Sequence, residues 1–152
     1  MKFSVNQQDL QQALSFCQGI IEKRSTLPIL SNILLDAKNS KLTITATDLD
    51  LIFIHNLNNI EILEEGKTTT SSSIMYDIVR KFSSGKKINL LLSDTSKLQL
   101  ESEKSIFNLN CINHSEFPLT DENFNDNTFV INSKHFLKLL NKCKFSISND
   151  ET

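Results

Sequence analysis

The chain has 152 residues, of which 39% are hydrophobic and 22% are charged, and its net charge is −2. This length suits one domain, or one domain and the start of another, and the composition is that of a globular chain rather than a disordered one. The near-neutral charge argues against bulk attraction to nucleic acid, and the lack of a membrane span or signal-peptide pattern makes us expect a cytoplasmic protein with no membrane partner.

The first predicted elements are a short strand and an amphipathic helix. Phe3 and Val5 alternate with polar residues, as in a strand with one buried face. Asn6 is a typical N-cap, whose side chain accepts hydrogen bonds from the free N–H groups that begin a helix. The helix is predicted over residues 7–18, because apolar residues recur there at helical spacing. These residues are Leu10, Ala13, Leu14 and Cys17.

Three strands are predicted after this helix, over residues 29–36, 41–47 and 51–57. Asp48 and Asp50 separate the last two, and we favour a hairpin turn there over a metal site, because no third acidic ligand is nearby. An acidic run follows, which we interpret as a solvated segment that a turn at Gly66 closes. Its members are Glu61, Glu64 and Glu65.

The same pattern recurs 65 residues later. Ser71 takes the place of Asn6, and a second helix is predicted over residues 72–82. Its apolar positions are Met75, Ile78, Val79 and Phe82. Three further strands are expected over residues 87–93, 97–102 and 105–111. The first 112 residues thus contain the order βαβββ twice.

A third copy begins 126 residues after the first, beyond a polar, acidic segment. Phe129 and Ile131 match Phe3 and Val5, and Asn132 matches the cap at Asn6. The sequence therefore predicts another strand, cap and helix, after which this copy looks truncated. Two βαβββ units with helices on one side of the sheets imply an α+β fold, rich in antiparallel pairing, with one covered and one exposed sheet face.

Catalytic and cofactor motifs are absent from the sequence. Three glycines are too few for a GxGxxG or GxxxxGK loop, and the three histidines are isolated. Cys17, Cys111 and Cys143 lie at long spacings, which indicates neither a zinc site nor a disulfide framework, and we expect them to be small buried apolar residues. We therefore expect no catalytic residue, no metal and no cofactor.

Basic residues gather near the predicted helix ends. Arg80 and Lys81 close the second helix, and Lys23 and Arg24 follow the first. In the third copy, lysines recur every four residues on the face opposite the apolar stripe, at Lys134, Lys138 and Lys142. Cations at helix C-termini complement the helix dipole, and they can equally meet phosphates. Charge alone leaves both interpretations open.

Several short segments carry a resemblance to a known family. Residues 24–30 read RSTLPIL, residues 47–50 read TDLD, and residues 116–118 read EFP. With the start MKF, this series resembles the bacterial sliding clamp, the β subunit of DNA polymerase III. The resemblance covers all 152 residues, and the block R-x-T-L-P-I-L is specific to that family.

The resemblance implies a DNA-clamp (processivity) fold with two βαβββ units per domain. Subunits of that family hold three such domains, and two subunits pair head-to-tail into a ring around duplex DNA. Residues 1–120 would form the first domain, residues 121–127 a linker, and residues 128–152 the start of the second. The implied partners are duplex DNA, a second clamp subunit, and the replicative polymerase and clamp loader, which bind through regions mostly outside these residues.

The resemblance also implies roles for individual residues. The positions that match DNA-facing residues are Arg24, Arg80, Ser148, Asn149 and Asp150. Phe107 and Leu109 match apolar residues on an exposed edge strand at the dimer interface, and Lys97 and Lys104 match basic neighbours there. The implied function is that of a non-catalytic processivity factor. The alternative is a small α+β nucleic-acid-binding module that forms no ring, and an enzyme ranks third.

Overall fold

The computed structural model describes residues 1–21, 27–94, 96–118 and 130–147, and the chain divides into two compact units, Met1–Leu119 and Thr120–Thr152. The first half of the first unit contains β1 (Lys2–Asn6), α1 (Gln7–Cys17), η1 (Pro28–Ser31), β2 (Asn32–Lys38), β3 (Lys41–Thr47), β4 (Ile52–Asn58) and β5 (Glu61–Glu64). The second half contains β6 (Gly66–Ser71), α2 (Ser72–Val79), β7 (Lys87–Asp94), β8 (Lys97–Ser102), β9 (Ser105–Ile112) and η2 (His114–Glu116). The second unit contains α3 (Ser133–Cys143) and η3 (Lys144–Ser146).

Within the described residues, nine strands form one sheet in the order β4-β3-β2-β6-β9-β8-β7-β1-β5. Each pair of neighbouring strands is antiparallel. The part β4-β3-β2-β6 and the part β9-β8-β7-β1-β5 meet at a short joint, where β6 pairs with β9 only through Thr69 with Ile112 and Thr70 with Cys111. The Thr69 hydroxyl supports this joint by donating to the Ile112 carbonyl at 2.7 Å. The α+β prediction is confirmed.

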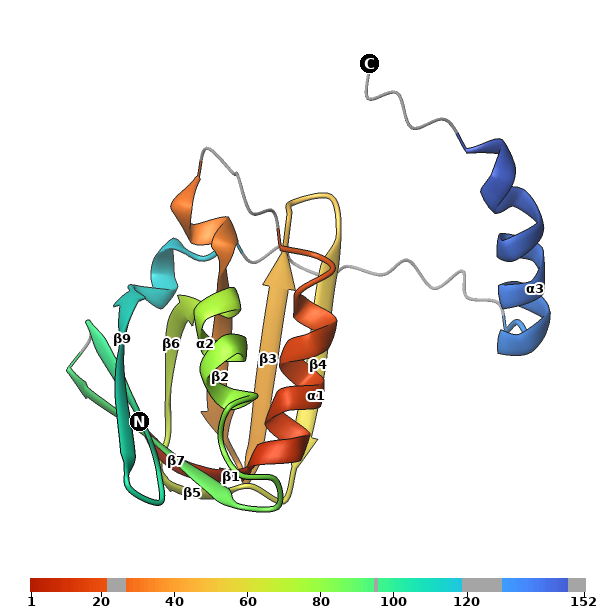
Figure 1. The fold of residues 1–152 in the computed structure, drawn as a ribbon. Coiled ribbons are helices and arrows are strands. Elements are labelled where there is room, and N and C mark those ends of the chain that lie inside the picture. The colour runs from red at the N-terminus through yellow and green to blue at the C-terminus, as the bar shows by residue number, and fades with distance from the viewer. Residues whose placement is uncertain (22–26, 95, 119–129, 148–152) are drawn as a thin grey trace. The chain divides into compact units, whose positions relative to one another are not determined.

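Both helices of the first unit cover the same face of the sheet, as the sequence predicted. Figure 1 shows α1 and α2 side by side in front of the strands. The Gln7 side chain at the start of α1 donates to the Val79 carbonyl at the end of α2 (2.9 Å). At the other end, the Gln18 amide donates to the Ser72 hydroxyl (2.9 Å). The core between helices and strands is apolar, and its fully buried large side chains include Phe3, Leu10, Leu14, Leu35, Ile44, Met75, Leu90 and Leu100.

The predicted helix starts are correct, but the caps differ. The Asn6 side chain accepts from the Gln8 N–H at 2.9 Å, as expected of an N-cap. Ser71 occupies the same position before α2, but its side chain makes no cap hydrogen bond. The helix α2 ends at Val79, three residues before the predicted end. The strand predicted from residue 29 begins later, because Pro28 starts the 3₁₀ turn η1 instead.

The sequence did not predict β5, because its glutamates made the segment resemble a solvated acidic run. Ile62 lies between exposed residues, packs against the core, and pairs with Phe3 across β1 and β5. Gly66 does not close a turn; it begins β6. A Cβ there would lie 2.9 Å from the Met1 Cβ, so the close approach of the N-terminus explains the glycine.

The second unit contains the predicted helix α3, and its cap is confirmed. The Asn132 side chain accepts from the N–H groups of Lys134 and His135 at 3.1 and 3.2 Å. Residues 130–132 form no strand, in contrast to the prediction for this copy. The apolar stripe of α3 has no strand of its own unit to cover it within residues 130–147. Its role as the start of a second domain stays a prediction.

Candidate functional site

A groove of about 550 Å³ lies along the helix-bearing face of the first unit. It is lined by Gln7, Gln8, Gln11, Gln12, Ser15, Tyr76, Arg80, Phe82 and Ser84. The helical period explains the lining, because the buried stripe of α1 turns its apolar residues to the sheet and leaves Gln8, Gln11 and Gln12 on the other side. The groove is therefore polar, and Arg80 is its one charged residue among those that the structure describes.

Gln7 forms the buried end of this groove, with 2% of its surface exposed. Its Nε2 donates to the Gln11 Oε1 at 2.8 Å and to the Val79 carbonyl at 2.9 Å. Its Oε1 is buried and has no hydrogen-bond partner in the described part of the chain. The Val79 carbonyl can only accept, so it fixes the Gln7 amide with Nε2 toward α2.

Arg80 stands at the C-terminal end of α2. Its guanidinium lies over the Tyr76 ring, 5.9 Å from the centroid. It also forms an exposed ion pair with Asp77, with 3.2 Å between the nitrogen and the carboxylate oxygen. The stacking on Tyr76 restricts where this cation can point. An exposed pair of this kind contributes little to stability, so Arg80 stays available to another anion.

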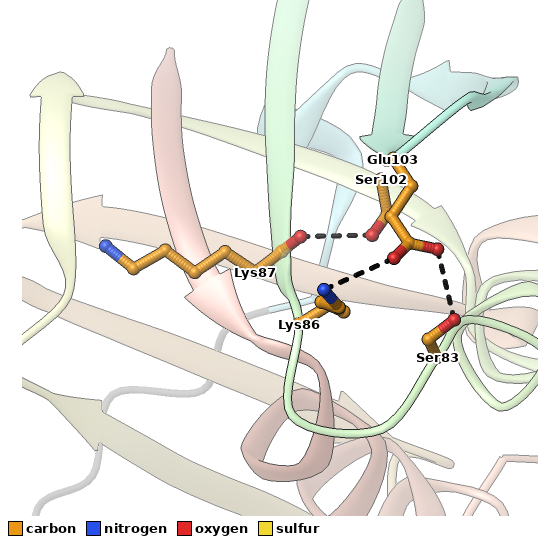
Figure 2. A network of polar contacts seen from close by, with 5 residues as sticks. All are labelled: Ser83, Lys86, Lys87, Ser102 and Glu103. Atoms are coloured by element: carbon orange, nitrogen blue, oxygen red, sulfur yellow. Dashed lines mark hydrogen bonds and ion pairs between the residues drawn. The ribbon is translucent and has the colours of Figure 1, made fainter.

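The loop after α2 forms one wall of the groove, and a polar network holds it (Figure 2). The Ser83 hydroxyl donates to the Glu103 Oε2 at 3.1 Å, and the Lys86 Nζ lies 3.5 Å from the Glu103 Oε1. The Ser102 hydroxyl donates to the Lys87 carbonyl at 3.1 Å. The hairpin between β8 and β9 thus fixes the loop.

The same loop is joined to the start of α1. The Gln8 Nε2 donates to the Ser84 hydroxyl at 2.6 Å, and the Gln7 N–H donates to the Lys86 carbonyl at 2.9 Å. The wall of the groove is therefore held from two sides, by the hairpin and by the helix.

Arg80 is the one predicted DNA-facing residue that the structure describes. It lies in the groove, on the face that carries both helices. Arg24, Ser148, Asn149 and Asp150 lie outside the described residues. The sequence showed that residues 7–18 are rich in glutamine and hold only Asp9 among charged residues. It gave no signal for the groove itself, because Gln7 is distant in the chain from Tyr76 and Ser84 and lies beside them only when α1 packs on α2.

The predicted dimer-interface residues lie on β8, on β9 and in the turn between them. One side of β9 pairs with β8 along its whole length, but β6 pairs with its other side only at Cys111 and Ile112. Residues 105–109 therefore leave one edge without a strand partner in the described part of the chain. Lys97 begins β8, and Lys104 is exposed in the turn before β9. In the sheet β9 lies between β6 and β8, so it is open only over residues 105–109, and its role as a subunit interface stays a prediction.

Phe107 and Leu109 differ in exposure. Phe107 is 38% exposed, and its ring meets the Phe82 ring at 5.7 Å between centroids. Leu109 is only 5% exposed and belongs to the core. The expected exposed position of Leu109 is therefore wrong: alternation along β9 puts Leu109 on the same face as Phe107, but core residues pack around Leu109 and cover it. Ile106, on the other face of β9, is 56% exposed.

Asp48 and Cys17 carry groups that could bind a metal or react, but the first has a structural role in a turn and the second in the core. The Asp48 Oδ1 accepts from the N–H groups of Asp50 and Leu51 at 3.1 and 2.7 Å, as in the predicted turn. Burial raises the pKa of Cys17 to about 12, so its thiol stays protonated near neutral pH. Cys111 is half-buried and Cys143 is exposed, so the expectation of three buried cysteines holds only for Cys17. The described residues hold no group of three potential metal ligands and no helix long and apolar enough to cross a membrane.

The motif RSTLPIL contributes to an apolar hollow of about 530 Å³ at one end of the first unit. Leu27, Pro28 and Ile29 line it together with Leu49 from the turn TDLD. Ile112, Glu116 and Pro118 complete the lining. Parts of three segments that carry the resemblance thus lie close together in space, although they are separated in the sequence.

Comparison with known proteins gives a consistent result. Residues 1–121 match the family model described as DNA polymerase III beta subunit, N-terminal domain. The chain is 33% identical over 153 residues to the beta sliding clamp of Caulobacter vibrioides, covering 100% of this chain and 41% of that protein. It is 34% identical over 154 residues to the beta sliding clamp of Rickettsia felis, covering 100% of this chain and 40% of that protein.

Solved structures show the same similarity. The structure described as Caulobacter crescentus pol III beta matches with a TM-score of 0.93 and 33% identity, covering 100% of this chain and 40% of that one. A sliding clamp from Bartonella birtlesii matches with a TM-score of 0.94 and 30% identity, covering 99% of this chain and 40% of that one. The chain spans about two fifths of the length of the relatives that it matches.

Proposed function

This chain belongs to the DNA polymerase III beta subunit family, and on that premise we propose that it forms the first domain of a sliding clamp. Such a clamp is a ring that encircles duplex DNA and keeps the replicative polymerase on its template. The single observation that carries the proposal for this chain is the helix-bearing face. Two helices lie side by side on one face of the sheet and present a polar groove with one cation, Arg80, among the described residues.

This face suits contact with DNA that must move. A protein that slides should touch phosphates, since these carry no sequence information, and should avoid strong contacts to base edges. Glutamine and serine side chains reach a phosphate directly or through water, and each such contact is weak and easily exchanged. Arg80 adds one cation to these neutral groups, and we assign the same phosphate-facing role to Arg24. We assign Ser148, Asn149 and Asp150 to a further segment that contacts DNA.

The open edge of β9 supports assembly into a ring. An unpaired strand edge is a site for pairing with another chain, and residues 105–109 present such an edge with Ile106 and Phe107 exposed. We assign this edge to a head-to-tail contact with a second subunit, flanked by Lys97 and Lys104. Leu109 supports the edge from inside the core. The ring acts without catalysis, in the cytoplasm, and binds polymerase and clamp loader through its other domains.

Primer extension tests this proposal. The full-length subunit that contains this chain is loaded on singly primed circular DNA with DNA polymerase III and its clamp loader, in the presence of excess trap DNA. The proposal predicts that products from a single binding event become much longer when the subunit is present. Products of the same length with and without it would overturn the proposal. A small binding module that forms no ring would not lengthen them.

A further inference from the structure

We propose that Glu103 is a positioning residue for assembly, whose carboxylate fixes the open edge of β9 in the shape that a second subunit meets. Glu103 lies in the turn between β8 and β9, where the flanking residues Ser102 and Ser105 pair with each other. Residues 105–109 follow directly, and they are the part of β9 with one edge unpaired in the described residues. The inference rests on the proposed function, because it concerns the edge that we assign to the contact between subunits.

The carboxylate joins this turn to the loop after α2, as Figure 2 shows. The Glu103 Oε2 accepts from the Ser83 hydroxyl at 3.1 Å, and the Glu103 Oε1 lies 3.5 Å from the Lys86 Nζ. Both oxygens are thus directed to the same loop. A strand edge without a partner has no ladder hydrogen bonds to hold it on that side. The two contacts of Glu103 supply this support at the tip of the hairpin.

The backbone of Glu103 indicates that this position needs its side chain. Its φ is 54°, in the left-handed region that glycine adopts without strain and glutamate does not. Asn39 and Asn59 also have positive φ between strands, at 52° and 58°, but asparagine tolerates this conformation. A strained glutamate where glycine would fit better is explained if its carboxylate is used.

An aromatic contact continues the same link along β9. The Phe82 ring precedes Ser83 in the loop and meets the Phe107 ring edge to face, with 5.7 Å between centroids. The loop after α2 therefore contacts the hairpin at its tip, through Glu103, and at the open edge, through Phe107. When Glu103 no longer holds the loop, we expect Phe82 to lose its fixed place beside Phe107. The exposed part of the Phe107 ring is then no longer presented in one orientation.

The expected effect is on assembly rather than on the stability of the fold. Lys86 and Glu103 form an exposed ion pair, and such pairs contribute little to the free energy of unfolding. A fixed edge, however, loses less conformational freedom when a partner binds, so the complex is tighter. Changes of this kind act mostly on the rate of dissociation. The lifetime of the dimer is therefore the quantity to measure.

A charge reversal and its rescue test the link. Full-length dimers labelled with a donor or an acceptor dye are mixed, and the rise of energy transfer gives the rate of subunit exchange. Glu103→Lys should speed exchange about fivefold. Adding Lys86→Glu restores an ion pair of opposite polarity and should return the rate to within about twofold of the unmodified protein.

The matched control breaks a similar pair elsewhere. Glu61→Lys removes the exposed pair between Glu61 and Lys87, whose charged atoms lie 3.0 Å apart and which joins β5 to β7 rather than the hairpin. This variant should exchange within about twofold of the unmodified rate.

A second variant separates positioning from folding. Glu103→Gly removes the carboxylate but suits the positive φ, so the unfolding temperature should not fall. Exchange should still be about fivefold faster, because the loop is released. A lower unfolding temperature with an unchanged exchange rate would assign Glu103 to the fold alone and overturn the inference.

The outcomes also distinguish this inference from the proposed function. Equal exchange rates for Glu103→Lys and Glu61→Lys would overturn it while leaving the ring intact. A fast rate that Lys86→Glu does not reverse would overturn it as well, because the effect would then come from the new charge beside Lys104. Failure of the ring would be visible in the unmodified protein, whose mass in solution would be that of a monomer.

Discussion

The ring of Phe107 meets the ring of Phe82 edge to face, with 5.7 Å between centroids. This contact joins the open edge of β9 to the loop after α2. In that loop Phe82 also lines the polar groove. Phe107 remains 38% exposed in spite of it, so part of its ring is left for another surface. The proposed subunit contact and the proposed DNA face are thus built on adjoining side chains.

Assembly is the first property that this arrangement predicts. In the full-length subunit, Phe107→Asp should convert a dimer to a monomer, because the interface loses about 1.5–3 kcal/mol of apolar burial per chain and gains a desolvated charge. Light scattering at low micromolar concentration measures the mass. Leu63→Asp makes the same kind of change at an exposed apolar residue of β5 and should leave the mass unchanged. A dimer that persists in Phe107→Asp would contradict the proposed interface.

Leu109 should behave as a core residue, in contrast to Phe107. Leu109→Ala should lower the free energy of unfolding by about 2–5 kcal/mol, because it leaves a cavity among the strands and helices. Phe107→Ala should cost less, since its ring is partly exposed. Urea denaturation measures both. A loss for Phe107→Ala larger than that for Leu109→Ala would contradict the deeper burial of Leu109.

Cysteine reactivity tests the burial of α1. The pKa of Cys17 is raised from its ordinary value of 9.0 to about 12 by burial, and its thiol lies 3.5 Å from the Ala13 carbonyl. Only a thiolate reacts readily with iodoacetamide. In the folded 152-residue chain at pH 8, the exposed Cys143 should be alkylated, and Cys17 only after unfolding. Mass spectrometry of the peptides locates the label; equal labelling of both residues would contradict the packing of α1.

The same pKa shift affects stability at high pH. Between about pH 9 and pH 12, the thiol of Cys17 loses its proton in the unfolded chain but keeps it in the folded one. The unfolded state then binds fewer protons, so the free energy of unfolding should fall as the pH rises through this window. Cys17→Ala should remove this part of the pH dependence.

Much of the fold could be predicted because local patterns agree with the tertiary structure. The limits of β3 and β8 were predicted to the residue, since alternating apolar residues mark one buried face in each. The strand β5 could not be predicted in this way, because its place is fixed by pairing with β1 and only Ile62 packs inward. The helix pair was predictable from the repeat, which fixed both apolar stripes.

The candidate site was less accessible to sequence reasoning. Arg80 could be found as a cation at a helix end, but the environment of Gln7 depends on Val79, which is 72 residues away in the chain. Leu109 was misplaced for a simpler reason: alternation along β9 puts Phe107 and Leu109 on one face, but only the packing shows which of them is covered. The alternation along β9 predicts the face on which a side chain lies, but its depth of burial depends on the residues that pack around it.

Retention on DNA of different topology tests the central claim most directly. The full-length protein is loaded onto a circular plasmid, and the bound fraction is measured at moderate salt before and after one restriction enzyme linearises the DNA. A ring holds circular DNA without strong contacts, so we predict that it stays bound to the circle and is lost through the free ends. A bound fraction that is unchanged by linearisation, with both ends unblocked, would contradict the sliding-clamp account.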